Sequence, residues 1–137
     1  MLSIGDMARR SGVKVPTIRY YEQMGLIAAP ERSSGNQRRY TNAELDRLTF
    51  IRHARDLGLS LDAIRELLHL SEQPEMPCVE AHVIATAHLS DIRKRIARLK
   101  RLEKELTRIE ASCNADHVGE CRIIHVLADH ALCESEH

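Results

Sequence analysis

A stretch over residues 79–111 contains neither glycine nor proline, and it limits strongly how the chain can fold. Its apolar residues recur at steps of three and four positions, which aligns them along one narrow stripe of a helix. Such a stripe is typical of a coiled-coil seam. A helix of this length spans about 50 Å, and a chain of 137 residues cannot bury its stripe within itself. We therefore expect a homodimer whose seam consists of Leu89, Ile92, Ile96, Leu99, Leu102, Leu106 and Ile109.

The composition favours helices over strands. Aromatic residues make up only 3% of the sequence, and all of them lie within the first 50 residues. Apolar residues still amount to 43%, so most of the core must be built from aliphatic side chains. Aliphatic packing suits helices better than a sandwich or a barrel. We expect a mainly all-α fold.

The balance of 20 basic and 20 acidic residues hides an uneven distribution along the chain. Residues 1–70 hold eleven Lys or Arg against eight Asp or Glu, whereas residues 111–137 hold one against five. The second segment also carries three of the four cysteines and four of the eight histidines. This distribution predicts a mildly basic head and an acidic tail rich in thiols and imidazoles.

Nothing in the sequence marks the protein for export or for a membrane. No basic region followed by an apolar run opens the chain, and no segment approaches the roughly 18 apolar residues that a spanning helix needs. We therefore expect a cytoplasmic protein without a membrane partner. Thiols stay reduced in that compartment, so the cysteines are interpreted as metal ligands, reactive thiols or buried small residues.

The head of the chain has the pattern of a helix-turn-helix followed by a wing. Ser3 caps a short helix, and after a glycine turn a second helix begins near Pro16 and ends at Gly25. Residues 30–40 combine turn residues with arginines, as expected for an exposed hairpin. Two further helices follow, one from the capping box Thr41-Asn42-Ala43-Glu44 and one capped by Ser60.

Arginine and tyrosine side chains of this head are suited to contact DNA. Arg19, Arg38 and Arg39 can neutralise phosphates, and the hydroxyls of Tyr20 and Tyr40 can donate to phosphate oxygens. A helix of this size also fits the major groove. The alternative interpretation is that the tyrosines belong to the core of a small helical domain.

Three cysteines form the clearest candidate metal site. Thiolates such as Cys78, Cys113 and Cys121 select soft or borderline cations, among them Zn²⁺, Cd²⁺, Hg²⁺, Pb²⁺ and Cu⁺. The alternative is burial as small residues, which the polar neighbours of the last two make less favourable. Cys78 and Cys113 flank opposite ends of the long helix, so they cannot share an ion within one chain. A shared site would require an antiparallel dimer.

Histidines could complete such a site. His117 lies between the two later cysteines, and His82 and His88 lie early on the long helix, where they could approach from a second copy. The alternative for each is a solvated surface imidazole. A loose auxiliary site in the tail would involve His130, Cys133 and His137, although a frayed terminus is the simpler expectation.

Catalytic motifs are absent. The sequence has no glycine-rich phosphate loop, nucleophile elbow or H-E-x-x-H motif, and we expect no enzymatic activity. Two functions outside metal-dependent regulation remain open. One is a DNA-binding protein with a purely structural metal, and the other is a thiol-redox sensor in which Cys113 and Cys121 form a reversible disulfide.

The whole pattern resembles the MerR family of bacterial regulators, in particular its metal-responsive branch. The match covers nearly the whole chain, and the combination of motifs is more specific than any one of them. The matching segments are Ile4-Gly5-Asp6-Met7-Ala8, Thr17-Ile18-Arg19-Tyr20-Tyr21-Glu22, Arg32-Ser33 with Arg38 and Tyr40, Leu48-Thr49-Phe50-Ile51-Arg52, and Leu57-Gly58-Leu59-Ser60-Leu61 with Ile64. The resemblance adds Thr17 and Arg32 to the expected DNA contacts.

The resemblance implies a winged helix-turn-helix DNA-binding domain and an antiparallel coiled-coil dimer on double-stranded promoter DNA. Metal binding would distort a promoter whose two elements are too far apart, so that RNA polymerase can use both. The expected target is a metal-efflux or detoxification gene. The implied divisions are a DNA-binding domain at 1–70, a linker at 71–78, a dimerisation helix at 79–111, and a metal-binding loop, short helix and tail at 112–137.

The resemblance also bears on the metal. A cysteine at position 78 goes with divalent ions in the family, whereas a serine there goes with monovalent copper, silver or gold. His88 resembles a position of cadmium and lead sensors. We therefore expect Cd²⁺, Zn²⁺ or Pb²⁺ ahead of Hg²⁺. The seven-residue gap between Cys113 and Cys121 resembles that of copper sensors, which keeps a monovalent sensor as an alternative.

Overall fold

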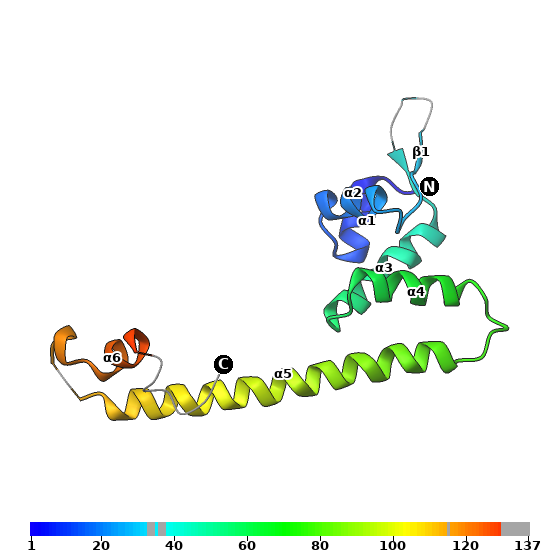
Figure 1. Cartoon of the computed structure of the whole chain (residues 1–137). Coiled ribbons are helices and arrows are strands. Elements are labelled where there is room, and N and C mark those ends of the chain that lie inside the picture. The colour runs from blue at the N-terminus through cyan, green and yellow to red at the C-terminus, as the bar shows by residue number, and fades with distance from the viewer. Residues whose placement is uncertain (33–34, 36–37, 115, 130–137) are drawn as a thin grey trace. The chain divides into compact units, whose positions relative to one another are not determined.

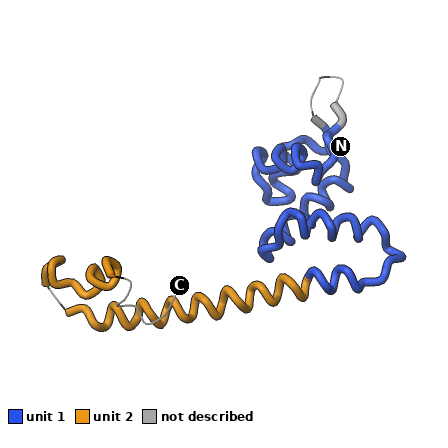
Figure 2. The backbone as a smooth tube through the Cα atoms, in the orientation of Figure 1, with its two compact units in different colours: residues 1–84 blue, residues 85–137 orange. Residues whose placement is uncertain are grey.

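The computed structural model of the chain describes residues 1–32, 35, 38–114 and 116–129. These residues form two compact units, residues 1–84 and residues 85–137, and each is described by itself (Figure 2). The expected all-α architecture is confirmed, because helices make up both units and the strands are limited to one short hairpin (Figure 1).

The helix-turn-helix of the first unit consists of α1 (Ile4–Ser11) and α2 (Val15–Gln23). The N–H of Asp6 donates to the Ser3 hydroxyl and the N–H of Ser3 donates to the Asp6 carboxylate, each at 3.1 Å. This capping box satisfies two N–H groups that the first turn of a helix leaves without a partner. The hydrogen bonds hold the pKa of Asp6 below its ordinary value, with the Ser3 N–H as the largest cause.

The turn between the two helices requires glycine at position 12. Gly12 has a φ of 76°, in the left-handed region, and its N–H donates to the Ala8 carbonyl at 2.9 Å. A Cβ atom there would lie 1.6 Å from Nη1 of Arg52, which donates to the Ser11 carbonyl at 2.8 Å. The left-handed backbone therefore favours glycine, and a Cβ atom would also displace the Arg52 guanidinium. Pro16 lies in the first turn of α2, as expected.

The wing is a hairpin of β1 (Glu31–Arg32) and β2 (Arg38–Arg39), paired antiparallel with Arg32 opposite Arg38. The expected hairpin is thus confirmed at its base. Residues 33–34 and 36–37, which the sequence assigns to the same loop, lie outside the described residues. An antiparallel bridge between Leu2 and Tyr40 fastens the base of the wing to the N-terminus.

Two further helices of the first unit follow the wing, α3 (Asn42–Asp56) and α4 (Leu61–Ser71). The expected caps are present, a capping box between Thr41 and Glu44 and a hydrogen bond from the Ala63 N–H to Ser60 Oγ. The side chains with almost no exposed surface come from the four helices α1 to α4, the turn after α2 and the end of the wing: Met7, Ile18, Leu26, Ile27, Tyr40, Leu48, Ile51 and Ile64. One continuous core therefore supports the helix-turn-helix and the wing.

The long helix α5 (Val79–Ser112) runs without a break for 34 residues, as expected from the sequence. A single 3₁₀ turn, η1 (Val118–Glu120), and the short helix α6 (Arg122–Ala128) follow it. Ile109 of α5 and Val126 of α6 are buried within the second unit, with exposed fractions of 3% and 1%. The division at 1–70, 71–78, 79–111 and 112–137 stays a prediction.

Candidate metal centre and DNA interface

Cys113 and Cys121 are brought together at the end of α5. Their sulfur atoms lie 3.3 Å apart, and both side chains are half-buried. Cys113 directly follows α5 and its N–H donates to the Glu110 carbonyl at 3.2 Å, so the end of the helix fixes its position. Cys121 directly precedes α6, and its carbonyl accepts the N–H of His125 at 3.1 Å.

The loop between the two cysteines is held by hydrogen bonds of its own. The N–H of Cys121 donates to the Val118 carbonyl at 3.1 Å, which closes the 3₁₀ turn. Nε2 of His125 donates to the Gly119 carbonyl at 2.9 Å and so ties η1 to α6. Sequence reasoning did not single out His125, because a histidine four residues after a cysteine carries no local signal for such a contact.

This thiol pair fits part of a metal site. Two thiolates on one tetrahedral zinc ion, each about 2.3 Å from it, lie about 3.8 Å apart, so a small opening of the pair would admit an ion. A stable site needs at least one further donor. Among the residues that the structure describes, no group of three or more His, Cys, Asp or Glu side chains is placed to hold a metal ion. Within the described residues, one copy of the chain therefore brings two sulfur donors together and no third donor.

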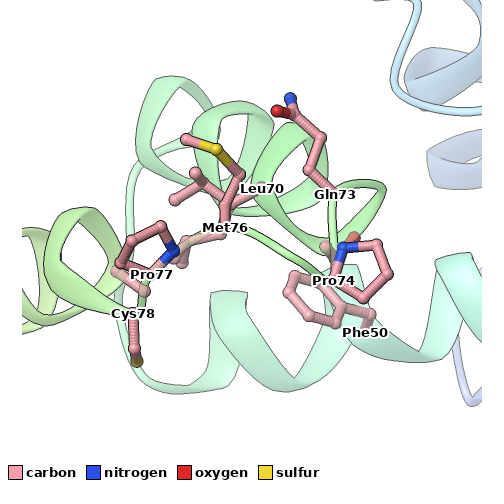
Figure 3. Close-up of a pocket in the computed structure, with 10 residues that line it drawn as sticks. Phe50, Leu70, Gln73, Pro74, Met76, Pro77 and Cys78 are labelled. Atoms are coloured by element: carbon pink, nitrogen blue, oxygen red, sulfur yellow. The ribbon is translucent and has the colours of Figure 1, made fainter.

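Cys78 lies in the first unit, apart in sequence from the thiol pair by the whole of α5. Its side chain is exposed and lines an apolar cavity of about 300 Å³ between α3, α4 and the linker (Figure 3). Figure 3 shows the sulfur atoms of Cys78 and Met76 pointing to opposite sides of the linker. The exposed thiol of Cys78 is thus accessible to groups from outside this unit.

Among the described residues, no histidine joins Cys113 and Cys121 as a third metal donor. His117 is exposed in the loop, His82 is exposed near the start of α5, and His88 is half-buried one turn and a half further on. The auxiliary residues expected in the tail, His130, Cys133 and His137, lie outside the part of the chain that the structure describes.

The residues expected to contact DNA divide into exposed and buried ones. Arg19 and Tyr20 are exposed on α2, Thr17 is half-buried on the same helix, and Arg39 is half-buried in β2. Arg32 and Arg38 face each other in the register of the wing. The helix-turn-helix and the wing thus belong to the same unit of the chain.

Tyr40 has a different environment. It has no exposed surface, and its hydroxyl donates to the carboxylate of Glu22. Ile18 and Tyr21 are also buried, whereas Tyr20 keeps 46% of its surface exposed. The alternative that the tyrosines belong to the core therefore describes Tyr21 and Tyr40, and we leave Tyr40 out of the proposed DNA contacts.

The expected seam of α5 is mostly exposed in a single chain. Leu89, Ile96, Leu99 and Leu106 expose between 44% and 63% of their surface, although all are large apolar residues. Ile109 is the exception, because it is already buried inside the second unit. We therefore also leave Ile109 out of the proposed dimer contacts, which retain Ile92 and Leu102 as half-buried members.

A winged helix-turn-helix followed by a long helix and a thiol pair defines a DNA-binding regulator with a separate sensing segment. The chain belongs to the MerR family: residues 2–70 match the MerR HTH family regulatory protein, and residues 45–109 match the description "MerR, DNA binding". It is therefore a transcription regulator of the metal-responsive kind. No helix among its described residues is long and apolar enough to span a membrane.

Similar proteins are metal-responsive regulators. The chain is 40% identical over 130 residues to the HTH-type transcriptional regulator ZntR of Escherichia coli strain K12, covering 93% of this chain and 92% of ZntR. The structure resembles that of the regulator PbrR691 from Ralstonia metallidurans CH34 in complex with lead(II), with a TM-score of 0.81, 39% identity, and coverage of 93% and 99%. It also resembles MerR from Bacillus megaterium MB1 in complex with mercury(II), with a TM-score of 0.71, 32% identity, and coverage of 93% and 100%. The names of these relatives describe regulators of transcription and not enzymes.

Proposed function

We propose that this protein is a transcriptional activator that responds to a soft divalent metal ion and controls a metal-efflux or detoxification promoter. Two copies associate through the exposed seam of α5 in antiparallel orientation. The ion is bound by Cys113 and Cys121 of one copy and Cys78 of the other. Cd²⁺, Zn²⁺ and Pb²⁺ are the preferred ions, ahead of Hg²⁺.

The observation that carries this proposal is the thiol pair, only 3.3 Å apart, together with an exposed third thiol at the far end of α5. An antiparallel dimer aligns the start of each α5 with the end of the other. Cys78 of a second copy then lies next to Cys113 and Cys121. Three thiolates suit soft and borderline divalent ions. Relatives in complex with lead(II) and mercury(II) support the same class.

The separation of the two sulfur atoms also bears on the charge of the ion. In a linear two-coordinate site the sulfurs lie on opposite sides of the ion, which at a bond length of about 2.3 Å requires a separation of roughly 4.6 Å. The observed 3.3 Å is closer to the bent arrangement of a site with three or four ligands. This geometry favours a divalent ion over monovalent copper, silver or gold.

DNA binding is assigned to α2 and the wing. Thr17, Arg19 and Tyr20 of α2 face the major groove, where a helix can reach base edges and phosphates. Arg32, Arg38 and Arg39 of the wing contact the backbone. Dimer symmetry then predicts a pseudo-palindromic site on double-stranded DNA.

Metal binding acts on the promoter through the shape of the DNA. An ion shared by two copies fixes the linker of one copy against the metal loop of the other. Because Cys78 is the last residue of that linker, the DNA-binding domain is constrained as well. A protein that bends or untwists its site stores a deformation energy on the order of 1–6 kcal/mol in the DNA. RNA polymerase then engages both promoter elements of the distorted site.

A run-off transcription assay on the protein's own promoter tests the proposal with a panel of metals. Wild type is compared with Cys78→Ser and with Thr86→Ala, a control at an exposed position of α5. Activation by Cd²⁺, Zn²⁺ or Pb²⁺ that Cys78→Ser abolishes and Thr86→Ala retains is the expected result. Activation by Cu⁺ that survives Cys78→Ser would instead indicate a monovalent two-thiolate sensor.

The same thiol pair favours a second candidate function, a redox sensor. Two thiols 3.3 Å apart need only a small approach to reach the disulfide length of about 2.05 Å. Oxidation by a peroxide would join the sulfurs, and the two electrons and two protons of the thiols would pass to the peroxide. Hydrogen peroxide would become two water molecules, and an organic peroxide would become an alcohol and water. A promoter that responds to peroxide and to no metal in the panel would support this candidate over the first.

A further inference from the structure

The C-terminal end of α2 lacks the basic side chain that is present at the ends of α1, α3 and α4. The last carbonyls of a helix have no partner within it and form the negative end of its dipole. Basic residues occupy the last turns of α1, α3 and α4, but none occupies the last turn of α2. Backbone N–H groups of the turn after α2 donate to the carbonyls of Tyr20, Tyr21 and Glu22. The carbonyls of the turn itself are left to accept a donor from another part of the chain.

Two arginines from outside α2 supply it. Nε of Arg47, on α3, donates to the Leu26 carbonyl at 2.5 Å, and Nη2 of Arg65, on α4, donates to the Met24 carbonyl at 2.9 Å. Both acceptors belong to the turn that follows α2, and Leu26 is fully buried there. We call Arg47 and Arg65 the arginine clasp.

One member of the clasp is also connected to the linker. Nη1 of Arg47 contacts a carboxylate oxygen of Glu72 at 2.9 Å. Glu72 is the C-cap of α4, where the segment leading to Cys78 begins. The two side chains are 29% and 57% exposed, so their ion pair adds little stability by itself. Its effect is geometric, because it holds the guanidinium in the orientation that directs Nε at the Leu26 carbonyl.

The surroundings leave this contact room to change. Arg47 and Glu72 line a surface cavity of about 530 Å³ together with Gly25 and Leu26. A shift of the linker can therefore move Glu72 without a clash. The guanidinium of Arg47 would rotate with Glu72. That rotation would decide whether Nε of Arg47 still donates its charge-assisted hydrogen bond to the Leu26 carbonyl.

From these contacts we infer that Arg47 and Arg65 are positioning residues for the DNA-recognition helix α2. Glu72, acting through Arg47, makes that position depend on the linker that carries Cys78. The inference rests on the proposed function, in which α2 reads promoter DNA and Cys78 binds metal. Neither arginine needs to touch DNA in this role, since the donors named here are used on backbone carbonyls and on Glu72.

Affinity for DNA without metal tests the clasp separately from metal sensing. Arg47→Met keeps most of the apolar stem and removes every donor, and it is compared with Arg55→Met, an arginine of α3 that donates to the Leu59 carbonyl instead. We expect Arg47→Met to weaken binding to the protein's own promoter duplex about tenfold, because that factor corresponds to the loss of one charge-assisted hydrogen bond. Binding to a scrambled duplex should change less than about twofold, because phosphate contacts supply non-specific affinity.

The salt dependence distinguishes positioning from direct contact. Arg47→Met should leave the slope of log affinity against log salt unchanged, whereas loss of a phosphate contact would reduce it by about one. Equal weakening on both duplexes with a reduced slope would overturn the inference, as would promoter affinity equal to that of Arg55→Met. If Arg47→Met lowers the melting temperature of the protein, Arg65→Met and the charge-conserving Arg47→Lys take its place. Their affinities for the promoter and scrambled duplexes and their salt slopes are then compared in the same way.

The connection to the linker is tested by Glu72→Gln in the transcription assay. We expect metal-free promoter affinity to fall, but by less than in Arg47→Met, because Nε of Arg47 can still donate to the Leu26 carbonyl. The ratio of metal-induced to basal transcription should drop clearly. An unchanged ratio would refute the role of Glu72. If no metal activates wild type, the proposed function fails instead, while the DNA-binding comparison still decides the role of the clasp.

Discussion

The sulfur atoms of Cys113 and Cys121 lie 3.3 Å apart, although seven residues separate them in sequence. The 3₁₀ turn of the loop and the hydrogen bond from His125 to the Gly119 carbonyl fix this approach before any ion is bound. A preorganised pair loses less conformational entropy on binding than two thiols on a free loop. A single copy of the chain therefore already holds two of the three ligands of the proposed metal site close together.

Loss of either thiol of the pair should abolish tight metal binding. We expect Cys121→Ser to weaken Cd²⁺ affinity by at least about 100-fold, because even residues that only support a ligand cost 10- to 100-fold when removed. Competition with a chromophoric chelator measures the affinity. Asn114→Ala, at an exposed position of the same loop, is the matched control and should stay near wild type. Comparable affinity for both variants would contradict the assignment of the thiol pair.

Tyr40 should act on stability and not on phosphate contacts. Tyr40→Phe removes the donor to the Glu22 carboxylate, and we expect a loss of about 1–2 kcal/mol in the free energy of unfolding. Chemical denaturation measures it. Tyr21→Phe is the control, because Tyr21 is also buried but no hydrogen bond of its hydroxyl is found among the described residues. A reduced salt slope of DNA binding in Tyr40→Phe would instead restore a phosphate contact.

Features encoded by nearby residues could be predicted from the sequence. The two capping boxes join residues three positions apart, Ser3 with Asp6 and Thr41 with Glu44, and both are present as expected. The long helix was predictable for the same reason, because its seam repeats over short steps. The spacing of Cys113 and Cys121 indicated a shared loop, and the structure brings their sulfur atoms together.

Features that depend on distant partners could not be predicted in this way. The burial of Tyr40 depends on its bridge to Leu2, and the sequence shows only a tyrosine after two arginines. Arg47 contacts a carbonyl 21 residues away, for which the sequence has no signal. The periodicity of α5 likewise cannot tell whether a seam residue is covered by its own chain, as Ile109 is, or by another copy.

The cap of α1 should make stability depend on pH in the acid range. Hydrogen bonds from Ser3 and, as a smaller cause, the contact with Arg9 hold the pKa of Asp6 below 3.8 in the folded protein. A lowered folded pKa means that the charged Asp6 stabilises the fold above pH 3.8, and that this contribution is lost as the pH falls through the folded value. We expect the difference in unfolding free energy between wild type and Asp6→Asn to shrink on acidification through this range. A difference that stays constant with pH would contradict the role of the charge.

Ile109 should stabilise the second unit from within. Its side chain is 3% exposed, and truncation to alanine leaves a cavity that costs about 2–5 kcal/mol. Hydrogen exchange of the amides of α6 measures the loss, because those amides are protected only while the unit is closed. Leu106→Ala, at a position that is 61% exposed in one chain, is the control. Equal protection of α6 in both variants would place Ile109 in the seam after all.

Leu99 should determine association. It is 63% exposed at the centre of the seam, so Leu99→Glu leaves the fold of a single chain intact but places a charge in an apolar contact. We expect the dissociation constant of the dimer to rise at least about 100-fold, because an unpaired buried charge costs several kcal/mol. Sedimentation equilibrium measures it, with Lys100→Glu as the control at the adjacent, exposed position. A dimer of unchanged affinity in Leu99→Glu would show that α5 associates through another face, and the proposed metal site shared between copies would then lose its geometric basis.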